Sequence, residues 1–169
     1  DFEIILDGQT IPQHDYHVFM VSLPRIFFKT NEIFCEPINF FQSDSKTALK
    51  WKKKFKDIEE TKIGIHWLTS SLMPEKDLPL EHFEKLSKDI NAKFFILQKN
   101  VSTNEISKIS KNKKIFYFSD MDKSEKAFLD SIEIIRNLDL VITSDTAVAH
   151  LSATLGKKTW IALPHVADW

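Results

Sequence analysis

The sequence predicts an α/β protein built on a doubly wound parallel sheet, with helices on both faces. From about residue 62 onward, short segments rich in Ile, Phe and Val alternate with amphipathic segments of about three helical turns. Such alternation is typical of parallel strands joined by covering helices. Residues 1–61 are more irregular, with apolar runs over 2–6 and 17–23 and a polar, helical stretch over 43–56.

The expected strands are short runs of apolar, β-branched or aromatic residues. They span residues 62–67, 93–97, 114–118, 138–142 and 158–163. Pro79 suits a first helical position and opens a helix after the first strand. The apolar face of this helix consists of Leu80, Phe83, Leu86 and Ile90. A weaker, lysine-rich helix is expected over 104–110.

Two further helices are expected in the second half of the chain. Ser124 can cap one of them. Its inward stripe is expected to be Ala127, Phe128, Ser131, Ile132 and Ile135. The other covers 145–155, with Gly156 at its C′ position. Its inward residues are Val148, Leu151, Ser152 and Leu155.

Composition excludes several classes of protein. The chain has 169 residues, of which 43% are hydrophobic and 28% charged, as in a globular domain. The 23 basic and 24 acidic residues nearly cancel, so bulk charge favours neither nucleic acid nor an anionic membrane surface as a partner. A single cysteine, Cys35, excludes a disulfide framework. No apolar run approaches the roughly 18 residues of a membrane span, and no His, Asp or Glu set has the spacing of metal ligands.

Ligands of open parallel sheets bind beyond the carboxyl ends of the strands. The segments expected there are 68–71, 98–100, 143–146 and 164–169. The strongest motif is 139–150, in which a buried strand, a Thr-Ser-Asp-Thr turn and a helix follow one another. The free N–H groups at the start of such a helix form an anion site, most often for phosphate. The alternative is a plain helix capped by Ser144 or Asp145.

Other residues at this edge allow two interpretations each. Thr146 and His150 are four residues apart and share the face opposite the apolar stripe, whereas Asp145 suits a sugar hydroxyl better than a phosphate. Trp67, next to His66, can stack on a base or cover the sheet. Lys99, after Gln98, can neutralise a phosphate or remain solvated. Residues 22–25 are explained by a Pro-kinked strand exit, and the chain has no GxSxG, P-loop or GxGxxG motif.

Several segments, in this order, resemble the glycosyltransferase domain of bacterial tetratricopeptide-repeat proteins. That domain is similar to the family 9 heptosyltransferases of the GT-B superfamily. The resemblance runs from about His17 to the last residue. It is most specific in Leu-Asp-Leu-Val-Ile-x-x-Asp-Thr-Ala-Val-Ala-His at 138–150 and in Leu-Pro-x-x-x-Asp-Trp at 163–169. The other matching segments are 22–24, 62–67, 78–80, 97–99 and 155–157.

The resemblance implies the donor half of a GT-B fold, which is Rossmann-like, in a chain truncated at both ends. Residues 62–169 would form the donor-binding domain, 43–61 a connecting helix, and 1–42 the last part of the acceptor-side domain. The implied activity is metal-independent, inverting transfer of a hexosyl or heptosyl group from a nucleotide-diphospho-sugar. The acceptor would be a glycan, a lipid-linked molecule or a protein. The resemblance also implies a cytoplasmic bacterial protein without a cofactor, with tetratricopeptide repeats upstream.

The resemblance implies that the substrate-binding residues are Trp67, Gln98, Lys99, Ser144, Asp145, Thr146 and His150. Asp145 and His150 would hold the sugar or ribose and the diphosphate, while Ser144 and Thr146 would bind phosphate oxygens. The catalytic base would lie outside this chain. The family usually carries a Trp-Ala-Gly-type loop and an arginine before its Pro-Leu motif, but here the loop is 67–71 and Lys76 stands near the arginine position. The alternative is therefore a degenerate glycosyltransferase-like module that serves as an interaction scaffold. A generic dinucleotide-binding domain ranks last, because the sequence has no glycine-rich fingerprint.

Overall fold

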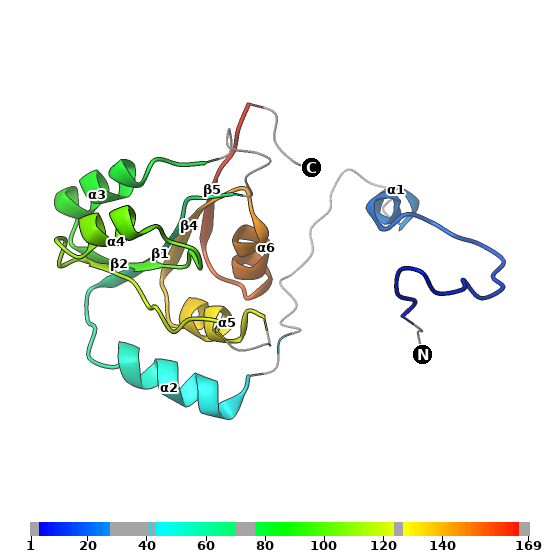
Figure 1. The fold of residues 1–169 in the computed structure, drawn as a ribbon, viewed down its shortest axis with the longest axis horizontal. Coiled ribbons are helices and arrows are strands. Elements are labelled where there is room, and N and C mark those ends of the chain that lie inside the picture. The colour runs from blue at the N-terminus through cyan, green and yellow to red at the C-terminus, as the bar shows by residue number, and fades with distance from the viewer. Residues whose placement is uncertain (1–3, 28–40, 42, 70–76, 124–126, 166–169) are drawn as a thin grey trace. The chain divides into compact units, whose positions relative to one another are not determined.

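The computed structural model describes residues 4–27, 41, 43–69, 77–123 and 127–165 (Figure 1). The chain divides into two compact units, residues 1–36 and residues 37–169, and each is considered by itself. None of the helices in these described ranges is long and apolar enough to cross a membrane.

The larger unit is built on one five-stranded sheet in which every pair of neighbouring strands is parallel. The strand order is β3-β2-β1-β4-β5. The strands are β1 (Thr61–His66), β2 (Ala92–Ile96), β3 (Ile115–Phe116), β4 (Leu140–Ser144) and β5 (Thr159–Ala162). The predicted fold class is confirmed.

Helices cover the sheet on both sides, as Figure 1 shows. Two of them, α3 (Leu80–Asp89) and α4 (Thr103–Ile109), pack on one face. The other face is covered by α2 (Ser45–Phe55), α5 (Leu129–Arg136) and α6 (Ala147–Thr154). The alternation of side chains along each strand supplies both cores. In β2, for example, Phe94 and Ile96 belong to the α3/α4 core, whereas Phe95 belongs to the other.

The middle of β1 lies unusually close to its neighbours. A Cβ atom at Gly64 would lie 2.5 Å from Leu138 Cδ1 and 2.9 Å from Leu97 Cδ1, both closer than ordinary contacts. The glycine therefore makes room for two leucines of the α2/α5/α6 core against the central strand.

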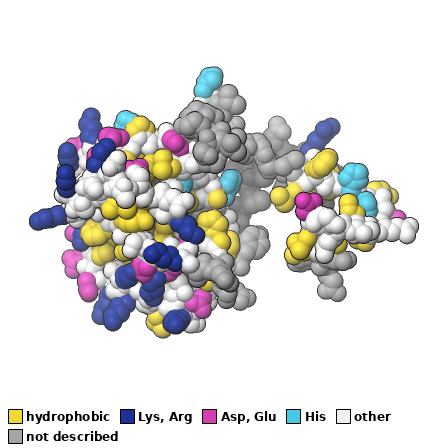
Figure 2. Space-filling view, in the orientation of Figure 1, with side chains coloured by type: hydrophobic (Ala, Val, Ile, Leu, Met, Phe, Trp, Pro, Cys, Tyr) yellow, Lys and Arg dark blue, Asp and Glu magenta, His cyan; other side chains and the backbone are white. Residues whose placement is uncertain are grey.

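Helix α2 is anchored to α5 through a single carboxylate. Asp130 accepts hydrogen bonds from Trp51 Nε1 at 2.6 Å and from Lys50 Nζ at 3.0 Å. Trp51 is fully buried, whereas Lys52, Lys53 and Lys54 of α2 are exposed. Figure 2 shows a cluster of basic side chains at the bottom of the view. The polar stretch over 43–56 is thus an amphipathic helix that completes one face of the sheet.

The smaller unit contains a 3₁₀ turn, Met20–Ser22, followed by α1 (Leu23–Phe27). The strand exit expected at residues 22–25 is therefore wrong, because this segment is helical. Proline tolerates the first turn of a helix, where its missing N–H leaves no bond unmade, so Pro24 does not prevent it.

Three helix boundaries also differ from the expected ones. Pro79 precedes α3 as its N-cap. Helix α6 begins at Ala147 with Thr146 as N-cap, in place of Ser144 or Asp145. Helix α5 begins only at Leu129, so Ala127 and Phe128 are exposed and do not join the inward stripe.

The late start of α5 has a local cause. Phe128 has a left-handed φ of 65°, which is incompatible with a helix. The side chain of Asp122, and not that of the N-cap residue, accepts from a free N–H at the start of α5. Asp122 Oδ1 accepts from the backbone N–H of Asp130 at 2.8 Å. The cap expected at Ser124 lies outside the described residues.

Candidate functional site

The strand order places a topological switch point, the position at which open α/β sheets form their ligand crevice, between β1 and β4. The chain runs from β1 to β2 on one side of β1, whereas β4 lies on the other side, so the direction of winding reverses between β1 and β4. In open α/β sheets, ligands bind at this position, outside the carboxyl ends of the strands. His66 ends β1 and pairs in register with Thr143 of β4, which places both next to the start of α6.

The first turn of α6 is not capped by the side chain at its N-cap. Thr146 has extended backbone angles that suit capping, yet its hydroxyl makes no cap hydrogen bond. The Thr146 Oγ1 atom instead lies 3.3 Å from Thr143 Oγ1 and 3.4 Å from His66 Nδ1. It also donates to the carbonyl of Ser144 at 3.4 Å. The Thr146 hydroxyl therefore does not occupy the backbone N–H groups at the start of the helix, which is where anions bind to helices.

Ser144 lies beneath this turn with an unsatisfied hydroxyl. The residue is 0% exposed, and its Oγ has no hydrogen-bond partner among the described residues. Leaving a buried hydroxyl unpaired costs about 1–3 kcal/mol, so such a group calls for an explanation. Its position directly before the start of α6 makes it a candidate ligand-binding group.

His66 contributes a neutral imidazole to the crevice. Burial lowers the pKa of His66 to about 4, although the nearby charge of Asp77 acts in the opposite direction. Near neutral pH the ring can therefore donate from one nitrogen and accept at the other. It adds polarity to the site without adding charge.

A cavity of about 230 Å³ opens beside His66, next to the carboxyl end of β2. Leu97, Met121 and Val148 give it apolar walls. Lys99 supplies a cation at its mouth, because this side chain is exposed while lining the cavity. Apolar walls with a few polar groups at one end are typical of small-molecule sites.

Gln98 and Lys99, which follow β2, line this cavity. The Gln98 Oε1 atom accepts from the backbone N–H of Leu68 at 3.1 Å. This hydrogen bond thus links the segment that follows β1 to the segment that follows β2. Asp145 is half-buried in the turn before α6, and His150 is exposed on that helix.

Trp67 is placed apart from these residues. It is 1% exposed, belongs to the core under α3 and α4, and donates from Nε1 to Glu105 Oε1 at 2.9 Å. This packing accounts for Trp67 without a ligand. The expectations for Lys76, for Ser70 and Ser71 in the loop, and for residues 166–169 concern positions outside the described residues.

Sequence analysis did not assign two residues that the structure brings to the site. The sequence indicated His66 only as the end of a strand. A polar side chain at the carboxyl end of a strand was itself the signal that could have identified it as a site residue. Asp122 gives no such signal, because its contacts with α5 depend on the path of the chain between β3 and that helix. Its carboxylate also accepts from the Ser131 hydroxyl, and both residues line the 230 Å³ cavity.

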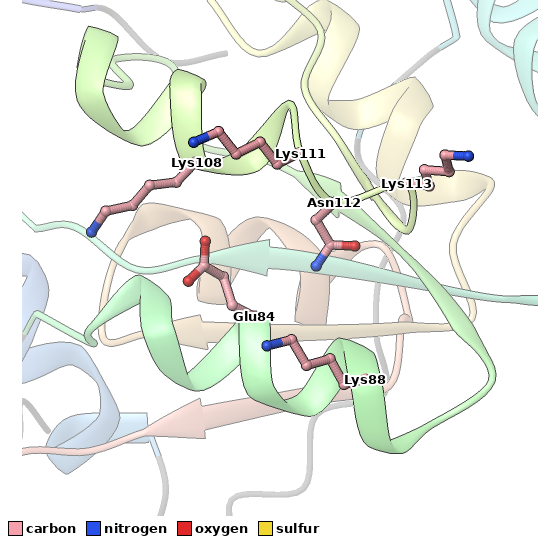
Figure 3. A pocket seen from close by; sticks show the side chains of 6 residues that line it. All are labelled: Glu84, Lys88, Lys108, Lys111, Asn112 and Lys113. Carbon is pink, nitrogen blue, oxygen red and sulfur yellow. The ribbon is translucent and has the colours of Figure 1, made fainter.

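A second hollow, of about 420 Å³, lies between α3 and α4 and is lined by four lysines (Figure 3). It sits at the amino-terminal edge of the sheet, because Lys88 is in the last turn of α3 and Lys111 follows α4. Lysines at these positions offset the partial negative charge of the helix C-termini. The same negative charge disfavours the binding of an anion in this hollow. In Figure 3 the Lys108 and Lys113 side chains point in opposite directions, and Lys108 is paired with Glu81 at 2.9 Å. The lysines around this hollow are therefore explained by their interaction with the helix C-termini, without a ligand.

A solved structure of a heptosyltransferase shares this fold. The ADP-heptose lipopolysaccharide heptosyltransferase II of E. coli superposes with a TM-score of 0.51 at 14% identity, covering 72% of this chain and 38% of that one. The E. coli heptosyltransferase WaaC, with ADP-2-deoxy-2-fluoro heptose, has a TM-score of 0.48 at 14% identity and covers 65% and 34%. The chain thus spans little more than a third of the length of these proteins.

Sequence comparison gives a more specific result. No curated protein sequence matches the chain. The sequence profile of glycosyltransferase family 9 (heptosyltransferase) matches residues 29–163, which is most of the chain. The matched range contains β1–β5 and the whole crevice between β1 and β4. The chain belongs to glycosyltransferase family 9, the heptosyltransferase family.

Proposed function

We propose that this chain binds the nucleotide-diphospho-sugar donor of an inverting, metal-independent glycosyltransferase. The observation that carries the proposal is the start of α6 at the β1/β4 crevice, where the N-cap side chain is turned away from the helix. A diphosphate there would accept from backbone N–H groups and gain from the helix dipole, which favours an anion by roughly 0.3–1 kcal/mol. The hydroxyl of Ser144 would donate to a further phosphate oxygen, while the Thr146 hydroxyl, which stays bonded to its polar neighbours, would not compete for these N–H groups.

The rest of the donor would occupy the neighbouring groups. The nucleoside end would enter the cavity beside His66, with Lys99 near the phosphates and Gln98 holding the wall. Asp145 and His150 would bind sugar or ribose hydroxyls and the diphosphate from the turn and from the exposed face of α6. Because the family is named for heptosyl transfer and the E. coli heptosyltransferase II is described with ADP-heptose, an ADP-linked heptose is the first sugar donor to test.

The chemistry needs the leaving diphosphate to be stabilised. An acceptor hydroxyl would attack the anomeric carbon, forming a new C–O bond as the bond between that carbon and the phosphate oxygen breaks. The acceptor's proton would pass to a base outside this chain. The start of α6 and the Ser144 hydroxyl would stabilise the negative charge that develops on the diphosphate. In the described part of the chain, no group of three or more His, Cys, Asp or Glu residues could hold a metal ion that would share this task.

The proposal is tested by thermal unfolding of the full chain with ADP, UDP, GDP and inorganic pyrophosphate. A ligand at 100 times its Kd stabilises the folded state by about 2.7 kcal/mol, so the melting temperature should rise with at least one nucleoside diphosphate. The rise should persist in EDTA. If no nucleotide shifts unfolding at millimolar concentration, the proposal is wrong and the scaffold alternative takes its place. If EDTA abolishes the shift, donor binding depends on a metal.

A further inference from the structure

The Thr146 hydroxyl has two competing places to bond. As the N-cap of α6 it could accept from a backbone N–H of the first turn, as threonine usually does at this position. It is instead directed to a polar group formed by Thr143, the Ser144 carbonyl and His66. A hydroxyl that capped the helix would occupy an N–H group that an anionic ligand needs.

The position of His66 is fixed by the sheet. It ends the central strand β1 and pairs in register with Thr143, so its ring is presented to β4 by two hydrogen-bonded strands. The ring is buried and neutral. The Thr146 hydroxyl has one proton, so when it donates to the Ser144 carbonyl, the bond between Thr146 and His66 requires a proton on His66 Nδ1.

We propose that His66 is a positioning residue that holds the Thr146 hydroxyl away from the first turn of α6 and so keeps the N–H groups of that turn for an anionic ligand. The inference rests on the proposed function for its ligand, a nucleoside diphosphate. Its structural part, the restraint of Thr146 by His66, is independent of that ligand. His66 acts through Thr146, so its effect should disappear when Thr146 has no hydroxyl.

Four variants of the full chain test this: His66→Leu, His66→Asn, Thr146→Val and the His66→Leu/Thr146→Val double variant. Asparagine can place a donor close to the position of Nδ1, whereas leucine cannot. Valine keeps the shape of threonine without the hydroxyl. His82→Leu, at an exposed histidine in the first turn of α3, is the matched control.

The first measurement needs no ligand. Hydrogen exchange of the Val148 amide, in the first turn of α6, should slow about threefold to tenfold in His66→Leu, because Thr146 is then free to cap the helix. His66→Asn should restore the wild-type rate. In the Thr146→Val background, His66→Leu should change nothing. An unchanged rate in His66→Leu, or an equal change with and without the Thr146 hydroxyl, would overturn the inference.

The second measurement is the affinity for ADP and for inorganic pyrophosphate. Affinity should fall about threefold to tenfold in His66→Leu, recover in His66→Asn, and be the same in Thr146→Val and in the double variant. If the wild-type chain binds none of ADP, UDP and GDP, the proposed function fails, and Val148 exchange still decides whether His66 restrains Thr146. If His66→Leu does not fold, the inference requires His66→Asn to keep the wild-type affinity and exchange rate, and a change in either overturns it.

Discussion

The burial of His66 ties the stability of the domain to pH. Its pKa is lowered from 6.5 to about 4 in the folded chain, mainly by burial. Between these values the unfolded chain binds a proton that the folded chain does not, so stability falls as the pH decreases. Above about pH 6.5 the titration of His66 does not reduce the free energy of unfolding. By about pH 4 it has reduced that free energy by up to roughly 3 kcal/mol.

This dependence is measurable by urea unfolding at a series of pH values. Carboxylates titrate in the same range, so the informative quantity is the difference between the wild-type chain and His66→Gln, which has no titrating ring. The wild-type free energy of unfolding should fall more steeply toward acid pH. Parallel curves for the two proteins would show that His66 has an ordinary pKa in the folded chain.

His150 offers the clearest separation of binding from stability. Its side chain is exposed on α6, whereas Val148 and Leu151 of the same helix are buried. His150→Ala should therefore leave the melting temperature nearly unchanged. If His150 bonds to the donor, losing a hydrogen bond to a charged group costs about 1.5–3 kcal/mol, which is a tenfold or greater loss of nucleotide affinity.

The control for this variant is His82→Ala, an exposed histidine on α3. It should change neither the melting temperature nor the affinity. A His150→Ala chain that unfolds more easily but binds as before would make His150 a structural residue, and the donor site would then have to be sought elsewhere.

At the scale of elements, α4 depends on one carboxylate that has two tasks. Glu105 Oε2 accepts from the backbone N–H and the hydroxyl of Ser102, completing a capping box, while Oε1 accepts from Trp67 Nε1. Ser102→Ala removes only the cap and should cost about 0.5–2 kcal/mol. Glu105→Ala should cost about 1–3 kcal/mol more, because it also leaves the buried indole N–H without a partner.

Chemical denaturation of the two variants checks this order. Trp67→Phe in the Glu105→Ala background is the matched control, since it removes the unpaired N–H and should recover part of the loss. Nucleotide affinity should stay the same in all of these variants if Trp67 serves only packing. A reduced affinity in Trp67→Phe alone would return Trp67 to the donor pocket, where the sequence prediction placed it.

The positions of the strands could be predicted from the sequence, because the middle of β1, β2 and β4 is largely buried and consists mainly of apolar residues. Helix starts were harder. The four residues 143–146 are all of types that can cap a helix, and only the backbone angles select Thr146. The cap of α5 comes from Asp122, which lies before the helix and contacts it only because of the path of the intervening chain.

The candidate site likewise contains residues that the sequence can indicate and contacts that depend on the fold. The positions of Ser144 and Thr146 could be predicted, because the sequence indicates a strand that ends directly before a helix. The contact between His66 and Thr146 joins residues 80 apart and depends on β1 lying next to β4, which is a property of strand order. The burial of Trp67 depends likewise on Glu105, which is 38 residues away.

At the scale of the whole sheet, its two edges differ. Ile115 of β3 is buried at one edge. At the other edge, Trp160 of β5 is 55% exposed and Ile161 is 44% exposed. These two residues pair with Ile142 and Thr143 of β4, so they face opposite sides of the sheet. Both sides of β5 thus present apolar surface, and the strand pairs with β4 alone among the described residues.

An apolar edge strand with unpaired backbone groups is a template for association with another chain. We therefore expect the protein to self-associate reversibly as its concentration rises, and Ile161→Lys to weaken this association. Because Ile161 is already half exposed, the substitution should change the free energy of unfolding by no more than about 0.5 kcal/mol. Sedimentation velocity over a concentration series measures the association, and urea unfolding measures the stability. Leu49→Lys, at an exposed leucine of α2 away from the sheet edge, should leave both unchanged. Equal association of wild type and Ile161→Lys would show that β5 is not the surface through which the chains meet.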